Sequence, residues 1–291
     1  MPRQTSIRRR TVLLAPAALT LRPAVAASRS RPPGQRWESA RAWAWARTRG
    51  WLVGCNFIPS TAINQLEMWQ PDTFDPVTIE RELGFAKGLG FRSVRVFLHD
   101  LPYRNEGRAF LDRIDRFLGI ARKQGIGALL VLFDGVWDPQ PVAGRQRAPR
   151  PGVHNSGWVQ GPGAAILGDP KRHSELEGYV TAVIERFRSD PRVHGWDLFN
   201  EPDNENEPSY GSRELADKHD KALALLERTF AWARAVNPTQ PLTAAPWRGD
   251  FSDPDKLAPI ERFMFANADV ISFHGYSKPE GMRKRITSLR R

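Results

Sequence analysis

The sequence predicts an α/β protein that forms an incomplete (β/α)8 TIM barrel, with about six βα units. From residue 51 onward, short apolar runs alternate with longer amphipathic segments. Apolar runs of this kind are typical of parallel strands buried on both faces. The first predicted βα turn also lacks the glycine fingerprint of a dinucleotide-binding sheet, which favours a barrel over a doubly wound sheet.

Hydrophobic spacing and chain-breaking residues set the element boundaries. The helix at 78–89 carries apolar residues on one helical face and ends at Gly90. The strand at 126–134 is a continuous apolar run, whereas the strand at 91–99 alternates apolar and polar residues. In chain order, the expected elements are strand 51–57, helix 78–89, strand 91–99, helix 109–124, strand 126–134, helix 174–188, strand 193–200, helix 214–236, strand 241–246, helix 256–268, strand 270–276 and helix 280–291.

Residues 1–27 are expected to form an export signal that resembles the twin-arginine type. Arg8-Arg9-Arg10 precede a short apolar run, and Ala24-Val25-Ala26 provides a small-residue cleavage site. The run is too short to span a bilayer. We expect a linker and an N-terminal helix over residues 28–50, and the barrel domain over residues 51–291. The mature protein is then periplasmic or secreted, with no membrane attachment after signal cleavage.

The net charge of +11 does not indicate nucleic-acid binding. Eight arginines and no acid lie within residues 1–36, and five more basic residues lie within 283–291, so the rest of the chain has a net charge of about −2. Cys55 is the only cysteine, and the six histidines form no HExxH motif. We therefore expect no nucleic-acid partner, no metal and no cofactor.

Aromatic side chains recur beside amides and carboxylates where the predicted strands end. Function in a barrel lies on the loops that follow the strand C-termini. Flat aromatic faces suit sugar rings, and polar groups suit sugar hydroxyls. The pattern predicts a carbohydrate cleft, or alternatively a set of aromatic residues that cap the core. The candidate aromatic contacts are Trp137, Trp158, Trp247 and Tyr276.

The fourth predicted strand ends at Asn200-Glu201-Pro202, where an apolar run stops at an amide and a carboxylate. This motif, together with His274-Gly275-Tyr276 on the sixth strand and Arg95 on the second, resembles the retaining glycoside hydrolases of the (β/α)8 clan. The likeness is greatest to glycoside hydrolase family 5, the cellulase and mannanase family, and it covers residues 51–291.

The resemblance implies hydrolysis of O-glycosidic bonds in a β-linked polysaccharide such as glucan, mannan or xylan. Glu201 would be the acid/base, and Asn200 would bind the sugar 2-hydroxyl. Arg95 and Tyr276 would orient the nucleophile, and His274 would line the cleft. From the residues alone, Arg95 could equally form a structural ion pair, and His274 could be a hydrogen-bonded core histidine.

Two features depart from the family pattern. Asp134, with Trp137 nearby, occupies the place of the family's strand-3 histidine, and His154 is a candidate substitute. The family's nucleophile is a glutamate on strand 7, whereas the last predicted element here is the helix at 280–291. We expect a barrel truncated before strand 7, without reliable turnover. If complete, the protein is expected to be a monomer. If the chain is active, Glu67, Asp134 and Asp203 are the first nucleophile candidates.

Two other classes of function stay open at this point. A non-catalytic, carbohydrate-binding relic would keep the aromatic loops, and a different, metal-assisted barrel enzyme would use other residues. The strand-4 motif and the histidine spacing weigh against the metal-assisted enzyme.

Overall fold

A computed structural model describes residues 35–248, 251 and 253–289. These residues fall within the unit Pro33–Arg291. Five parallel strands form one sheet in the order β1-β2-β3-β4-β5. The strands are β1 (Gly54–Asn56), β2 (Ser93–Phe97), β3 (Gly127–Asp134), β4 (Val193–Asn200) and β5 (Leu242–Ala245). This succession of neighbouring parallel strands is that of an incomplete barrel.

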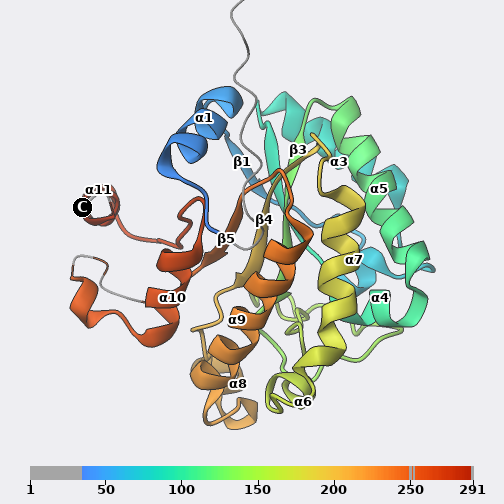
Figure 1. The fold of residues 1–291 in the computed structure, drawn as a ribbon. Coiled ribbons are helices and arrows are strands. Elements are labelled where there is room, and N and C mark those ends of the chain that lie inside the picture. The colour runs from blue at the N-terminus through green and yellow to red at the C-terminus, as the bar shows by residue number, and fades with distance from the viewer. Residues whose placement is uncertain (1–34, 249–250, 252, 290–291) are drawn as a thin grey trace, which may run out of the picture. The chain divides into compact units, whose positions relative to one another are not determined.

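The crossover connections contain the main helices, and Figure 1 shows α5, α7 and α9 side by side along one face of the sheet. The α-helices are α1 (Ser39–Arg49), α2 (Gln65–Trp69), α3 (Pro76–Gly88), α4 (Asp100–Glu106), α5 (Arg108–Lys123), α6 (Ala164–Leu167), α7 (Glu177–Phe187), α8 (Glu207–Tyr210), α9 (Lys218–Val236), α10 (Pro259–Asn267) and α11 (Pro279–Ser288). Short 3-10 turns are η1 (His173–Leu176), η2 (Gly211–Arg213) and η3 (Pro254–Lys256).

The core fills the space between the sheet and these helices. Every residue of β4 is buried, and all but one of β3. Trp69 is the centre of an aromatic group, with edge-on contacts to Phe110 and Phe117 and an indole N–H that donates to the Phe97 carbonyl at 2.7 Å. Burial of these aromatic side chains stabilises the packing of the helices against the outer face of the sheet. The ends of the strands remain available for a functional site.

Local sequence explains where the elements begin. Asp75 precedes α3 and accepts hydrogen bonds from the backbone N–H groups of Val77 and Thr78, while Pro76 occupies the first turn. The predicted helices correspond to α3, α5, α7, α9, α10 and α11. The short helices α2, α4, α6 and α8 were not predicted, because each has too few residues to show a hydrophobic period.

Two predicted strands are corrected by the structure. The strand expected at 51–57 is reduced to the three residues of β1, all of which are exposed. Residues 270–276 lie beside β5 but form no strand. Two backbone hydrogen bonds join this part of the chain to β5 and the residue after it, from the N–H of Asp269 to Leu242 O (2.8 Å) and from the N–H of His274 to Pro246 O (3.3 Å). Both segments lie at the edges of the sheet, where a strand lacks a second neighbour.

The predicted export signal at 1–27 lies outside the described residues, and so does most of the expected linker. Helix α1 occupies the C-terminal part of the region 28–50. Among the helices of the described residues, none combines the length and the apolar character needed to cross a membrane.

Candidate active site

The candidate site is built where β3 and β4 end side by side. Asp134 and Asn200, the last residues of these strands, are partners in the parallel register. Glu201 follows directly, and its backbone N–H donates to Ala245 O of β5 at 2.9 Å. Three neighbouring strands therefore fix the position of the acid candidate that the sequence predicted.

A chain of hydrogen bonds joins the second, third and fourth strands beneath Glu201. The guanidinium of Arg95 donates to Asp197 Oδ2 at 2.5 and 3.0 Å and to Asn200 Oδ1 at 2.7 Å. Asn200 Nδ2 donates to Asp134 Oδ1 at 2.8 Å. Because one side of the amide binds a cation and the other a carboxylate, the orientation of Asn200 is fixed.

An irregularity in the sheet makes this network possible. The register between β4 and β5 shifts between Asp197 and Asn200. In a regular strand, residues three apart face opposite sides of the sheet. Here both side chains reach Arg95, as expected where a bulge turns a residue toward a functional site.

Glu201 is buried and has a left-handed backbone, with φ of 45°. This conformation is uncommon for a residue other than glycine and is found at functional sites. Asn204 Nδ2 donates to Glu201 Oε2 at 2.7 Å, and His274 Nδ1 contacts Oε1. Gly135 lies beneath this turn, where an added Cβ would be 2.5 Å from the Glu201 carbonyl oxygen. Both carboxylate oxygens therefore have a defined partner.

Asp134 is the last residue of β3 and is buried. Burial raises the pKa of its carboxyl to about 7, against the lowering effect of the hydrogen bond from Asn200. The nearby charge of Glu201 raises the pKa further, and Arg95 lowers it. Its second oxygen, Oδ2, is buried without a partner among the described residues. A carboxyl in this setting changes its protonation near neutral pH.

Asp203 connects the loop after β4 to the loop after β5. Its carboxylate accepts the backbone N–H groups of Trp247 (2.8 and 3.1 Å) and Arg248 (2.6 Å). The Trp247 ring lies 5.6 Å from the Tyr276 ring, and Tyr276 is 83% exposed. Asp203 therefore holds in place an exposed aromatic pair that a sugar could contact.

We expect replacement of Asp203 by alanine to destabilise the protein by about 1–3 kcal/mol, because two backbone donors lose their acceptor. Chemical denaturation measures the change. Asp169→Ala is the matched control, since Asp169 also accepts a backbone N–H, from Lys171, but at an exposed position. Equal effects of the two substitutions would show that Asp203 does not fix the loop.

The tryptophans after β3 lie in two different environments. Trp158 is buried against Phe97, with the ring centroids 5.1 Å apart. Trp137 has φ of 78° and packs between His154 (5.7 Å) and Trp158 (5.9 Å). Trp158 therefore packs in the core beneath the site, whereas Trp137 lies nearer the surface. His154, the candidate substitute for the strand-3 histidine, contacts Trp137 and not Glu201.

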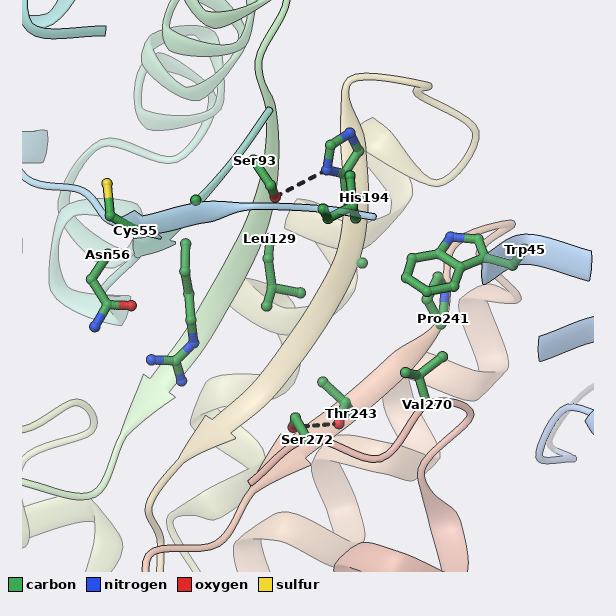
Figure 2. Close-up of a pocket in the computed structure, with 14 residues that line it drawn as sticks. Trp45, Cys55, Asn56, Ser93, Leu129, His194, Pro241, Thr243, Val270 and Ser272 are labelled. Atoms are coloured by element: carbon green, nitrogen blue, oxygen red, sulfur yellow. Dashed lines mark hydrogen bonds between the residues drawn. The ribbon is translucent and has the colours of Figure 1, made fainter. Parts of the chain in front are cut away.

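A cavity of about 410 Å³ opens on the inner face of the sheet. Figure 2 shows Leu129, Ser93 and His194 on one side of it and Thr243 and Ser272 on the other, each polar pair hydrogen-bonded at 3.0 and 2.7 Å. Burial lowers the pKa of His194 to about 4. Arg95 lines this cavity, whereas Glu201 does not.

Sequence reasoning missed Asp197 and Asn204 as members of the site. Asp197 could have been found from the sequence, because a carboxylate within a mostly apolar, buried strand requires a cation nearby.

Within residues 35–248 and the described residues that follow, no group of three or more His, Cys, Asp or Glu side chains could hold a metal ion.

The chain is similar to known proteins in part of its sequence and in its fold. No protein-family model matches the chain. Over 101 residues, 34% of this chain, it is 29% identical to a probable mannan endo-1,4-beta-mannosidase F of Aspergillus flavus, and to the same enzyme of Aspergillus oryzae. The match spans 19% of those relatives.

Among solved structures, the β-mannanase of the blue mussel Mytilus edulis matches 78% of this chain and 71% of its own, with 15% identity and a TM-score of 0.50. A GH5_18 enzyme of Streptomyces cattleya in complex with Manβ1-4GlcNAc matches 77% of this chain and 51% of its own, with 15% identity and the same TM-score. The predicted resemblance to family 5 is confirmed. The likeness to these structures shows a (β/α)-barrel fold, of which the described residues contain five strands.

Proposed function

We propose that this protein is a retaining glycoside hydrolase of β-linked polysaccharide, and that mannan is its first candidate substrate, ahead of glucan and xylan. One observation carries the proposal: Glu201 is buried at the end of β4, next to Asn200, with both carboxylate oxygens engaged. The mannosidase and mannanase names of the similar proteins support the choice of mannan.

In this mechanism Glu201 protonates the glycosidic oxygen and later removes a proton from water. Asn204 donates to Oε2, and Oε1 faces His274 Nδ1. His274 is then a hydrogen-bond partner of the acid and not only a lining residue. Asn200, held by Arg95 and Asp134, presents its amide beside the acid.

We further propose that the nucleophile is a carboxylate outside the described residues. Asp134, Asp197 and Asp203 lie at or near the ends of β3 and β4, and each is only 1% exposed. Each also accepts hydrogen bonds from protein donors. Glu67 accepts the N–H of Ile63 at 2.7 Å, away from this network. Burial of the three aspartates and the hydrogen bonds to all four groups disfavour them as nucleophiles that attack a sugar.

The test is sugar release from mannan, glucan and xylan, with the anomer of the first product followed by NMR. The 291-residue chain is compared with the longest product of its gene. Release of the β-anomer first supports the retaining mechanism. Turnover by the 291-residue chain alone would place the nucleophile among the four carboxylates above. Sugar binding without turnover by either protein would instead support a carbohydrate-binding relic.

We also propose that the protein is exported. Cleavage after the small residues at 24–26 is expected to give a mature N-terminus near Ala27. Mass spectrometry of periplasmic or secreted material checks this. Intact Met1 or Pro2 in a cytosolic pool would contradict it.

A further inference from the structure

A second cavity, of about 590 Å³, lies beside Trp137. One wall comes from the loop after β3, with Asp138, Arg147 and Arg150, and the other from α8 and η2, with Tyr210 and Arg213. The loop leaves the sheet at the same end as Glu201, because β3 and β4 are parallel. The cavity is therefore on the functional face of the barrel.

The walls of this cavity carry three guanidinium groups and one carboxylate. Arg213 pairs with Asp138 at 2.8 Å and lies over the Tyr210 ring at 5.2 Å. Arg147 and Arg150 form no ion pair with any carboxylate of the described residues, whereas Arg213 in the same cavity is paired with Asp138. The cavity therefore has an excess of positive charge that no described side chain balances.

The arginines are presented from a loop that hydrogen bonds hold in place. Arg150 N–H donates to the buried Ser156 hydroxyl at 2.8 Å. The buried Asn64 donates through Nδ2 to Gln146 Oε1 and to Gly157 O, both at 2.8 Å. These bonds hold the loop from which the two guanidinium groups extend into the cavity.

We propose that this cavity is a subsite for an anionic sugar unit, one that bears a carboxylate or a sulfate ester, within the polysaccharide substrate. The proposal rests on the proposed function and specifies its substrate. Trp137 and Tyr210 offer aromatic faces to a sugar ring, and Arg147 and Arg150 offer planar donors that suit a carboxylate or a sulfate. Neutral sugar chains would leave this charge without a partner.

The test is equilibrium binding of the full chain to matched oligosaccharides by calorimetry at low and physiological salt. A uronic-acid-bearing oligosaccharide is compared with its carboxyl-reduced, neutral form, and a sulfated oligosaccharide distinguishes the two anion sources. We expect the acidic ligand to bind about tenfold tighter than the neutral one. The double variant Arg147→Gln/Arg150→Gln is expected to lose this preference and to keep its affinity for the neutral ligand.

The matched control is Arg81→Gln/Arg108→Gln, which removes the same charge from exposed positions on α3 and α5. Equal affinity for the acidic and neutral ligands, or an equal loss in both double variants, would overturn the proposal. Because binding is measured and not turnover, a preference for the acidic ligand together with no turnover by the longest product of the gene would refute the hydrolase function and leave the subsite standing.

Discussion

Replacing Glu201 by glutamine is expected to lower turnover of polysaccharide by about 10²–10⁴-fold in the hydrolytically active form of the protein. Glutamine keeps the shape and accepts the Asn204 hydrogen bond, but it has no proton to transfer. The loss should be much smaller on aryl glycosides with good leaving groups, because they need little protonation. Steady-state rates on both substrate types measure the difference.

The control for this substitution is Glu207→Gln, which makes the same chemical change at an exposed position at the start of α8. It should leave both rates unchanged. A Glu201→Gln protein that still hydrolyses polysaccharide at the original rate would exclude Glu201 from proton transfer. Equal losses on the two substrate types would indicate a positioning role.

Replacing Asp134 by asparagine is expected to change the pH dependence of stability more than any other single substitution proposed for this protein. The pKa of Asp134 is about 7 in the folded state, against 3.8 for an ordinary aspartate. Between these values the folded state holds a proton that the unfolded state has lost, so the contribution of Asp134 to stability falls as pH rises from about 4 to 7. The loss is at most about 4 kcal/mol.

Asparagine cannot ionise, and it can still accept the hydrogen bonds from Asn200 and from the Val136 N–H. The free energy of unfolding of the variant, relative to that of the original protein, should therefore rise between pH 5 and pH 8. Urea denaturation at both values measures it. Asp112→Asn, at an exposed position of α5, is the control. Parallel pH profiles of the Asp134 variant and the original protein would contradict the shifted pKa.

The candidate site was predictable in part because its residues terminate recognisable strands. The boundaries of β4 match the predicted 193–200, and this placed Asn200 and Glu201 at the edge of the sheet. Arg95 was predicted on the second strand, where it lies. The alternative prediction, that Arg95 forms an ion pair, is also confirmed, because Arg95 pairs with Asp197. The positions of these residues do not test their predicted catalytic roles, which the experiments above examine.

The sequence by itself determined the order of elements, the parallel sheet and the edge at which the polar residues gather. Apolar periodicity and strand order are local properties, so they can be read along the chain. Only the tertiary structure decided that Asp197 and Asn200 share Arg95, since this depends on a shift in register between two strands. It also decided that residues 270–276 form no strand, and that His274 nevertheless reaches Glu201 from 73 residues away. Such contacts depend on the packing of distant segments, which no local pattern records.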